Sequence, residues 1–383
     1  MNYIQPKIIV ISSVQPKPTS AGQALLYRHL NQLDGWDIEV IEAPKPTLME
    51  TLLHRMQNTR FHYWANDLEV LMAGSRWKKP VRLNKFSNSE TIILTVAHED
   101  GCWEALRFSK INRIPLVTFF NDWYPDFPSA HNKCKQLLNK RFKNLYIKSD
   151  LAFCASEGMK QSLGNHPNSY VLYGIPAILE NKAIVDKYPS QLNEQNREFN
   201  VLYFGNLYDY GSIIATFLQE IKNNPRIRGQ VRGAKPNWTQ DFHSEMRDRN
   251  LWLDFAPREE LDQWLASADA FLVVMSFDPA LRRRMETSFP TKIAEYAQFG
   301  KPLVIWGPDY CSAILWGRGG DRALCVTDQN PAVLVSALEN LKQSPEKQEY
   351  YAQQAKIAAQ AEFNPVLIQN QFLEHISNLI IKT

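Results

Sequence analysis

Residues 288–308 read SFPTKIAEYAQFGKPLVIWGP, and the fold prediction starts from this stretch. Pro290 suits the first turn of a helix, and Gly300 ends the helical pattern. The run KPLVIWGP that follows has the composition of a strand buried on both faces. The stretch therefore predicts a helix followed by a parallel strand, which is the repeating unit of an α/β domain.

The same alternation extends along the whole chain in two blocks. Short apolar, β-branched runs separated by helix-like segments indicate buried strands. These runs are 7–14, 37–43, 90–97, 115–122 and 151–156 in the first block, and 200–206, 227–234, 252–257, 270–276, 301–308 and 323–328 in the second. The pattern predicts an α/β protein made of two Rossmann-like parallel-sheet domains.

A polar stretch from Asn181 to Asn200 separates the two blocks. We expect an N-terminal domain over 1–180, a linker over 181–200, and a C-terminal domain over 201–364. A final helix over 365–383 is expected to pack back toward the N-terminal domain. Because ligands of such domains bind beyond the carboxyl ends of the strands, we expect the two domains to face a central cleft that holds the site.

Composition and charge limit the possible functions. The chain has 383 residues, of which 44% are hydrophobic and 22% charged, and its formal net charge is +3, which argues against a protein built to bind nucleic acid. No apolar run is long enough to span a bilayer, and the first residues lack the features of a signal peptide, so we expect a cytoplasmic protein. The five cysteines show no C-x-x-C spacing and are expected to be reduced thiols.

Several cofactor motifs are missing from the sequence. The segment 15–23 after the first strand lacks G-x-G-x-x-G, and the segment 204–211 lacks the lysine and serine of a P-loop. A D-x-D pair of metal-binding aspartates is also missing. We therefore expect neither a cofactor nor a metal.

Positive charge gathers just before and within the opening stretch. Arg282, Arg283 and Arg284 lie on an expected loop after the strand 270–276, and Lys292 lies in the first turn of the expected helix. A helix N-terminus and several cations suit a diphosphate whose charge grows as a bond to it breaks, and Glu295 is placed to accept hydrogen bonds from hydroxyls of the same ligand. The alternative is a solvated arginine face and an ordinary Lys292–Glu295 surface pair.

These residues resemble a known signature. The run PTKIAEYAQFGKPLV is similar to the P-x-K-x-x-E-Y-x-x-x-G-x-P-V-V motif of the GT-B glycosyltransferases of family 4, also called glycosyl transferases group 1. The segments FNVLYFGNL, LWLDFAPREELDQWLASADAFLV, IPLVTFFNDWYPD and DLAFCASEGMK are similar to further parts of the family pattern. The resemblance covers most of the chain, more loosely over the first 90 residues.

The resemblance implies a GT-B architecture and transfer of a hexose-type sugar from a nucleotide-sugar to an acceptor hydroxyl, with retention and without metal. In the family, the second glutamate of an E-x7-E motif holds the ribose, and it corresponds to Glu295. The first glutamate contacts the sugar, but its position here is Thr287, and Glu286 stands one residue early. The products expected are polysaccharides, glycolipids or other glycoconjugates.

On the donor side, the resemblance places the glycine turn of the C-terminal domain at Gly205 and Asn206, and the base near Phe255. The family's Arg-Lys pair for the diphosphate is absent from 205–211. We therefore expect Lys292 and one of the arginines 282–284, with Arg282 first, to take over that charge.

On the acceptor side, Gly22 falls where the family has a small-residue loop, although a plain turn glycine is an equal alternative. Asp122 ends a buried strand beside the expected cleft, and Asn121 stands where many relatives have a histidine. His98, after the preceding strand, is a candidate to serve instead, although a single histidine is more often structural. The neighbouring Glu99 and Asp100 are expected to be loop charges.

Residues 131–150 form a basic segment with interleaved apolar side chains. It predicts an amphipathic helix that either contacts an anionic membrane from the cytoplasmic side or packs on its own domain. Acceptor choice is expected in the segment 54–86, whose aromatic and basic residues suit a sugar contact, a lipid contact or plain packing. Two alternative functions stay open: a non-catalytic GT-B-like subunit that binds a partner, and a sugar-nucleotide epimerase, which needs a buried acid–base pair.

Overall fold

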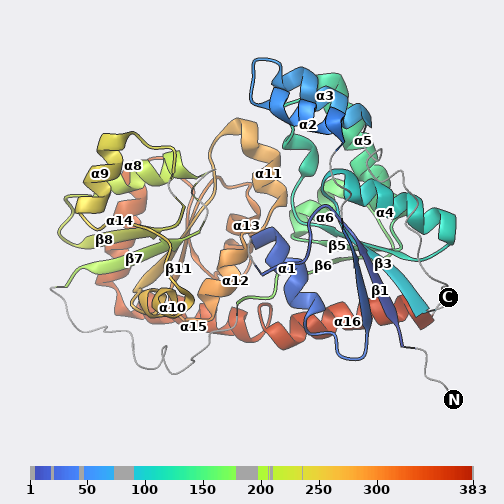
Figure 1. Ribbon diagram of the computed structural model, residues 1–383. Coiled ribbons are helices and arrows are strands. Elements are labelled where there is room, and N and C mark those ends of the chain that lie inside the picture. The colour runs from blue at the N-terminus through green and yellow to red at the C-terminus, as the bar shows by residue number, and fades with distance from the viewer. Residues whose placement is uncertain are drawn as a thin grey trace. The chain divides into compact units, whose positions relative to one another are not determined.

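The computed structural model describes residues 5–18, 21–42, 47–72, 90–177, 197–205, 207, 210–234 and 236–381 (Figure 1). The chain divides into two compact units. Unit 1 comprises residues 1–175 and 368–383, and unit 2 comprises residues 176–367. Most of the expected linker, 181–196, lies outside the described residues.

Unit 1 is built on a six-stranded sheet with the order β2-β1-β3-β4-β5-β6, in which every neighbouring pair is parallel. The strands are β1 (Lys7–Ile11), β2 (Asp37–Ile41), β3 (Thr91–Val96), β4 (Leu116–Phe120), β5 (Leu151–Cys154) and β6 (Ser169–Val171). The last of these is too short to show an apolar run, and the sequence pattern did not indicate it. The central strands β3 and β4 are buried along their whole length, which explains their continuous apolar sequences.

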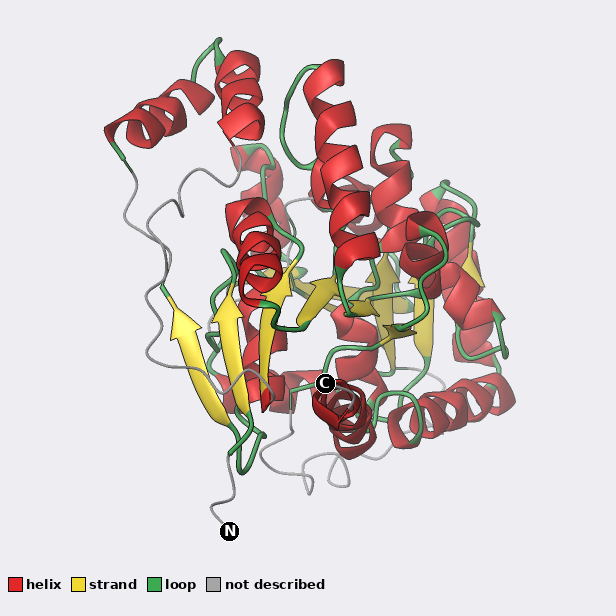
Figure 2. Ribbon diagram, turned by 90° about the vertical axis from the view of Figure 1, so that its right-hand side faces the viewer, coloured by secondary structure: helices red, strands yellow, loops and turns green. Residues whose placement is uncertain are grey.

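Helices cover both faces of this sheet (Figure 2). They are α1 (Ala21–Leu30), α2 (Leu48–Gln57), α3 (His62–Met72), α4 (Glu99–Asn112), α5 (Asn132–Lys148), α6 (Glu157–Leu163) and the long α16 (Pro365–Ile381), with the short 3-10 turn η2 (Tyr124–Asp126). Ile368, Phe372 and Ile376 of α16 are buried in one core of unit 1 together with Leu26 and Val117. A hydrogen bond between His29 Nδ1 and Gln369 Oε1 (2.9 Å) ties α16 to α1.

Unit 2 has a second six-stranded parallel sheet, with the order β12-β11-β10-β7-β8-β9. Its strands are β7 (Phe199–Phe204), β8 (Ile227–Arg232), β9 (Trp252–Leu253), β10 (Ala270–Val274), β11 (Leu303–Trp306) and β12 (Leu324–Val326). The two parallel sheets confirm the predicted α/β fold class.

The helices of unit 2 are α8 (Gly211–Ile221), α9 (Gln240–Asp248), α10 (Arg258–Ala266), α11 (Arg282–Thr287), α12 (Thr291–Ala297), α13 (Ser312–Arg318), α14 (Pro331–Gln343) and α15 (Pro345–Gln360), and η3 (Pro279–Leu281) is a 3-10 turn. The expectation of a loop at residues 282–284 is wrong, because these arginines open α11. Arginine is a good helix former, so a short basic run does not by itself indicate a loop.

The strand orders fix where a ligand is expected in each unit. In unit 1 the chain goes from β1 to β2 on one side and returns to β3 on the other side of β1. In unit 2 it goes from β7 outward to β8 and β9 and returns to β10 on the other side of β7. At such a switch point the loops leave toward opposite faces and open a crevice at the carboxyl ends of the strands.

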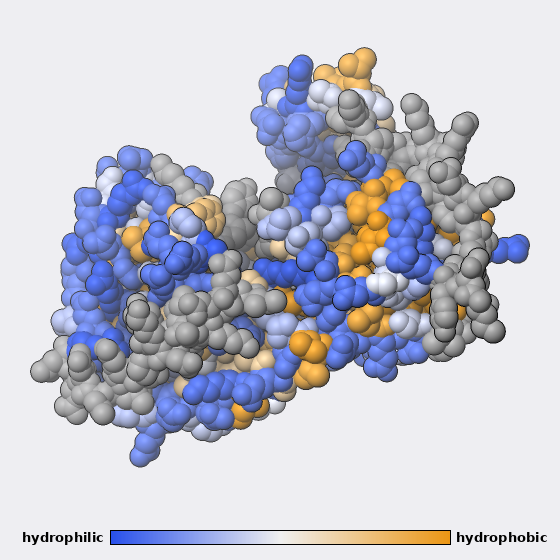
Figure 3. Space-filling view, turned by 60° about the horizontal axis from the view of Figure 1, so that its bottom comes forward, coloured by the Kyte–Doolittle hydropathy of each residue, from blue (hydrophilic) through white to orange (hydrophobic). Residues whose placement is uncertain are grey.

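Figure 3 shows one face of the protein, on which hydrophilic side chains predominate and hydrophobic ones form smaller patches. None of the helices in the described part of the chain has the length and apolar character needed to cross a bilayer. All five cysteines are free thiols.

Candidate functional site

The donor-side candidates Gly205 and Lys292 meet at the switch point of unit 2. Gly205 follows β7 with a φ of 140°, a backbone conformation open mainly to glycine. A Cβ atom at this position would lie 3.1 Å from Lys292 Nζ, and that Nζ lies 3.8 Å from the centroid of the Tyr203 ring. The glycine therefore leaves room for an amine that rests on an aromatic face beside β7.

Tyr296, in α12, explains why these groups lie together. Strands β7 and β10 pair only at Val201 and Leu202, so the backbone of Phe204 has no ladder partner on the β10 side. The Tyr296 hydroxyl takes that place: it accepts a hydrogen bond from the Phe204 N–H (2.6 Å) and donates one to the Phe204 carbonyl (3.0 Å). The Tyr296 ring stacks on Phe271 of β10 at 4.4 Å. The tyrosine of the motif thus joins α12 to the end of β7.

Burial lowers the pKa of Lys292 to about 7, while the nearby carboxylate of Glu295 acts in the opposite direction. Glu295 is half-buried and follows one turn after Lys292 on α12. A buried amine whose charged form is disfavoured gains most from an anionic ligand, because the anion restores the favourable charge state. The lowered pKa of Lys292 therefore favours a phosphate-binding role over the alternative of an ordinary Lys292–Glu295 surface pair.

A second glycine, Gly233, shapes the same edge of the sheet. It follows β8, and a Cβ atom there would overlap the carbonyl oxygen of Gly205. The Gly205 N–H donates to the Arg232 carbonyl (3.1 Å), so the two turns lie against each other. The sequence did not single out Gly233, although, like Gly205, it lies near the end of a predicted strand.

Phe255 lies beyond β9 at the same end of the sheet. The residue is 60% exposed, and its ring forms an edge contact with the Phe204 ring, with centroids 6.2 Å apart. Asn206, the other residue of the predicted glycine turn, lies outside the described residues.

Three further candidates, Arg282, Glu286 and Thr287, are on α11, and their surroundings differ from those of Lys292. The Glu286 carboxylate pairs with Arg282 (2.7 Å), and the Arg282 guanidinium lies 4.4 Å from the Tyr310 ring centroid. Thr287 is fully buried, and its hydroxyl donates to the Arg283 carbonyl (2.8 Å). Because consecutive residues of an α-helix project about 100° apart, Glu286 does not take the direction of Thr287.

The acceptor-side candidates come together in unit 1. Gly22, His98 and Asp122 line one cavity of about 340 Å³ at the carboxyl ends of β1, β3 and β4. Gly22 is in the first turn of α1 rather than in a loop, and a Cβ atom there would meet nothing within 4 Å. Burial lowers the pKa of His98, while Glu99 and Asp122 act to raise it, so the imidazole is mainly neutral at pH 7.

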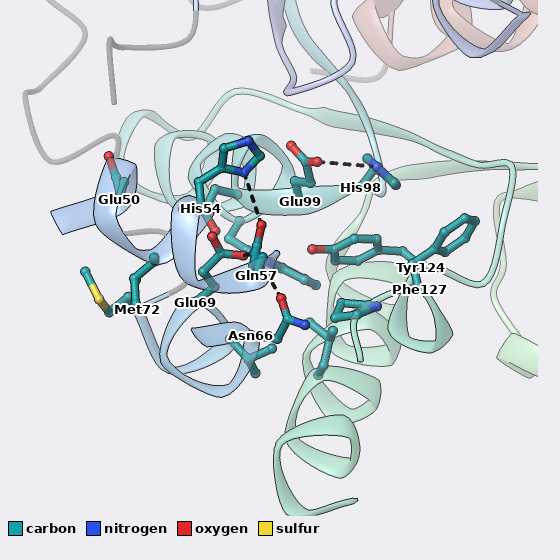
Figure 4. A pocket seen from close by; sticks show the side chains of 16 residues that line it. Glu50, His54, Gln57, Asn66, Glu69, Met72, His98, Glu99, Tyr124 and Phe127 are labelled. Carbon is teal, nitrogen blue, oxygen red and sulfur yellow. Dashed lines mark hydrogen bonds and ion pairs between the residues drawn. The ribbon is translucent and has the colours of Figure 1, made fainter. Parts of the chain in front are cut away.

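The expectation that Glu99 and Asp100 are loop charges is wrong. Both are in the first turn of α4, and Glu99 has a φ of 51°, which is uncommon for a non-glycine residue. Gly101 follows them, and its N–H donates to the Ser13 hydroxyl (2.9 Å) in the loop after β1. Glu99 and His98 also line a second cavity of about 520 Å³ that extends toward α2 and α3 (Figure 4).

The segment 131–150 contains helix α5 (Asn132–Lys148), and the apolar side of this helix turns into unit 1. Leu138, Phe142, Leu145 and Tyr146 are buried, whereas the lysines at 133, 140, 143 and 148 are exposed. Membrane contact by this segment stays a prediction, and its apolar side chains are already used for packing.

We compared the chain with known proteins. No family model matches it, and no curated protein matches it either. Solved structures do match: Alr3699/HepE of Anabaena in complex with UDP has a TM-score of 0.63 at 16% identity over 97% of this chain and 100% of its own. Sucrose-phosphate synthase of Thermosynechococcus elongatus gives 0.61 at 13% identity over 99% and 100%, and a glycosyltransferase of Rickettsia africae gives 0.62 at 13% over 100% of both chains.

The chain has the GT-B fold. This confirms the GT-B architecture that the signature implied, while the low identities establish the fold alone. Within the GT-B fold, unit 2 carries the Gly205–Lys292 pair and unit 1 carries the cavity of Gly22, His98 and Asp122. Among the described residues of this GT-B chain, no three His, Cys, Asp or Glu side chains gather as metal ligands.

Proposed function

We propose that the protein is a glycosyltransferase that moves a hexose-type sugar from a nucleotide-sugar to an acceptor hydroxyl. The observation that carries this proposal is the position of Lys292 beside Gly205 at the switch point of a GT-B sheet. A cation next to a glycine turn at this place suits a diphosphate. The proposal is further supported by HepE, which has been solved with UDP and with UDP and glucose. A UDP-sugar is therefore the first donor to test.

In the proposed reaction, Lys292 holds the diphosphate. As the bond between the sugar C1 and the phosphate oxygen breaks, negative charge grows on that oxygen, and a protonated Lys292 stabilises it. The acceptor oxygen forms the new bond to C1 on the same face, and its proton goes to the leaving phosphate oxygen. The configuration at C1 is then retained, and neither a protein base nor a metal is needed.

The other residues of unit 2 have positioning roles in this proposal. Glu295 accepts hydrogen bonds from the ribose, Gly205 and Asn206 let the backbone approach the phosphates, and the exposed Phe255 ring lies near the base. One of the arginines 282–284, at the start of α11, adds positive charge for the diphosphate.

Unit 1 takes the acceptor in this proposal. Gly22, His98 and Asp122 line the acceptor cavity, where the neutral His98 imidazole accepts a hydrogen bond from a hydroxyl. The acceptor is a sugar or a glycolipid in polysaccharide or glycoconjugate synthesis. We place the protein in the cytoplasm or on the inner face of a membrane, with the exposed lysines of 131–150 as a contact to anionic lipid.

A thermal-shift panel with UDP-, GDP-, ADP- and dTDP-sugars tests the donor site. A donor at about 100 times its Kd adds about 2.7 kcal/mol of stability, which gives a clear shift. We expect stabilisation by one nucleotide class, with the shift lost in Lys292→Ala and kept in Lys222→Ala, a lysine of the same unit that pairs with Glu245. No shift with any donor contradicts the proposal.

Retention and metal independence need separate measurements. The anomeric configuration of the product, read from its proton NMR couplings, should equal that of the donor sugar. Activity should be unchanged by EDTA.

The non-catalytic GT-B-like subunit is the alternative favoured by one observation. The position of the family's first glutamate holds Thr287, which is fully buried. Donor binding without hydrolysis or transfer of the sugar supports this alternative, and turnover of any nucleotide-sugar eliminates it.

A further inference from the structure

The 520 Å³ cavity of unit 1 has a polar wall built by α2 and α3. Gln57 lies at its centre: its Nε2 donates to Glu69 Oε2 (2.7 Å) and Asn66 Oδ1 (2.9 Å). A further hydrogen bond joins Gln57 Oε1 to His54 Nδ1 (3.1 Å). The dashed lines in Figure 4 show this network along the side of the cavity. Four polar side chains from two helices are thus held in fixed positions around one space.

The opposite wall is aromatic. Tyr124, Phe127 and Trp103 line it, and the His98 ring meets Tyr124 edge-on at 4.6 Å. In Figure 4 the Tyr124 hydroxyl points toward the wall formed by α2 and α3. A flat aromatic face opposite hydrogen-bonding side chains suits a sugar ring, whose faces are apolar and whose rim carries hydroxyls.

Among the described residues, the carboxylates and basic groups that line the cavity are unevenly represented, with acidic residues predominating. Glu50, Glu69, Glu99 and Asp100 are among its lining residues, although the Glu50 carboxylate turns to the Thr47 N–H, and the described residues that line it include neither lysine nor arginine. Burial raises the pKa of Tyr124, and the surrounding Glu99, Cys102, Asp100 and Glu69 raise it further, as expected where negative potential is high.

We propose that this cavity binds the acceptor as a sugar without phosphate or carboxylate groups, using carboxylates to accept hydrogen bonds from neighbouring hydroxyls. The identification of this ligand as an acceptor rests on the proposed function, and it is supported by the shared lining residues His98 and Glu99, which connect this cavity to the one at the strand ends. An anionic group would be repelled by the carboxylates in a partly desolvated space.

Sugars paired by a single phosphate test this proposal. Binding of methyl glucoside and methyl glucoside 6-phosphate, and of the matching galactose and mannose pairs, is measured by saturation-transfer NMR without any donor. We expect the neutral member of at least one pair to bind at least tenfold more tightly than its phosphate. The variant Glu69→Gln/Asp100→Asn should narrow that preference, while Asp34→Asn, which removes a carboxylate from the exposed turn before β2, should leave it unchanged. Equal or tighter binding of the phosphates, or no binding in any pair, overturns the proposal.

The thermal-shift panel with nucleotide-sugars distinguishes a failure of the cavity assignment from a failure of the proposed function. A donor shift without binding of neutral sugars overturns only the cavity assignment. Binding of neutral sugars without a donor shift overturns only the transferase proposal.

The outer side of α2 and α3 carries a second, independent feature. Eight large apolar or aromatic side chains of α2, α3 and the turn between them are exposed, with Leu48 at 92% and Trp64 at 64%. The others are Met49, Leu52, Phe61, Tyr63, Leu68 and Leu71. Leu53 and Val70 of the same helices line the cavity beside polar residues, so this helical pair presents apolar side chains both to the cavity and to the surface.

Acidic and basic side chains of this helical pair differ in their surroundings. Glu50 is buried and accepts from the Thr47 N–H, Asp67 accepts from the His131 N–H, and Glu69 accepts from Gln57. The exposed charged side chains within 47–72 are Arg55 and Arg60. The outer side of α2 and α3 is therefore apolar and cationic.

We infer that the outer side of α2 and α3 docks on the surface of an anionic membrane. Apolar side chains with tyrosine, tryptophan and arginine match the interface between acyl chains and anionic head groups. Exposed lysines of α5, which packs beside α3, add to the attraction. This surface replaces the apolar side of α5, which is buried, as the part that enters the lipid.

Co-sedimentation of the full chain with vesicles tests this docking. We expect binding to vesicles with 30% phosphatidylglycerol, and at least tenfold weaker binding to pure phosphatidylcholine. The triple variant Leu48→Ser/Leu52→Ser/Trp64→Ser should weaken the binding at least tenfold, whereas Val333→Ser/Ile357→Ser, at exposed positions of α14 and α15, should not. Circular dichroism melts confirm that both variants stay folded. Absence of binding to the anionic vesicles, or a dimer of the chain that the triple variant breaks, overturns the proposal.

Discussion

The Nζ atom of Lys292 lies 3.8 Å from the centroid of the Tyr203 ring, at the carboxyl end of β7. The amine is held at this place by burial and an aromatic face, in the space that Gly205 leaves open. A lysine kept this way is poorly solvated without a ligand, so the free protein is less stable for it. Replacing Lys292 by an uncharged residue is therefore expected to raise the stability of the free protein and to weaken donor binding.

Lys292→Met should stabilise the free protein at neutral pH by roughly 1–2 kcal/mol, because the amine is desolvated; the figure is kept low because the residue as a whole is partly exposed. The pKa of Lys292 in the folded protein is about 7, below its unfolded value, so the unfolded chain binds more protons between pH 7 and 10.5. The stability of the wild type therefore rises across this window, and the advantage of the variant should shrink as pH rises. Urea denaturation at pH 6.5, 8 and 9.5 measures this, and a constant difference contradicts it.

Donor binding should take up a proton above pH 7. The diphosphate favours the charged form of Lys292 and raises its pKa, so affinity should fall by up to about tenfold per pH unit above 7. Calorimetry in buffers of different ionisation enthalpy measures the uptake, with a nucleotide-sugar as ligand because its diphosphate does not titrate there. Affinity that stays constant from pH 6 to 9 rules out this role for Lys292.

Tyr296→Phe should destabilise unit 2 by about 1–3 kcal/mol, because the Phe204 N–H and carbonyl both lose their partner. It should also weaken donor binding, since Gly205 follows directly. Tyr351→Phe is the control: its hydroxyl makes one exposed bond of 3.4 Å to Asp321. Denaturation midpoints of the two variants should differ clearly, and equal midpoints would refute the structural role of Tyr296.

The sequence predicted the α/β class well because strands buried on both faces have continuous apolar runs. Lys292 was indicated by its place in the first turn of a predicted helix and Gly205 by the family resemblance, and the structure brings the two together. The sequence did not reveal the Tyr296 hydroxyl as the partner of Phe204, because this depends on where β7 and β10 stop pairing.

Other features of the candidate sites could not be predicted from the sequence either. The left-handed backbone of Glu99 depends on how α4 fits against the loop after β1, and no local residue pattern marks it. The apolar residues of α2 and α3 include both buried and exposed ones, and the helical period does not tell them apart. Only the packing of Leu53, Ala65 and Val70 shows which side faces inward.

Two glycine variants should separate packing from ligand contact. Gly233→Ala should destabilise unit 2 by several kcal/mol, because its Cβ would overlap the Gly205 carbonyl. Gly22→Ala should be neutral or stabilising by up to about 1 kcal/mol, since its Cβ meets nothing within 4 Å and alanine favours the helix. Thermal melts measure both, and a folded Gly22→Ala with reduced transfer locates the defect in the acceptor cavity. A melting temperature of Gly233→Ala equal to wild type would contradict the packing argument.

Acid should destabilise unit 1 through His29. Burial lowers the pKa of this imidazole to about 4, and its hydrogen bond with Gln369 holds α16 in place. The unfolded chain binds its proton near pH 6.5, so stability falls as pH drops from 6.5 to 4, by about 3 kcal/mol in all. His29→Asn keeps a hydrogen-bonding group near the Nδ1 position without a titrating ring. Urea denaturation from pH 7 to 4 should therefore show a shallower decline in this variant than in the wild type, whatever their starting stabilities, and parallel declines would exclude His29 as the cause.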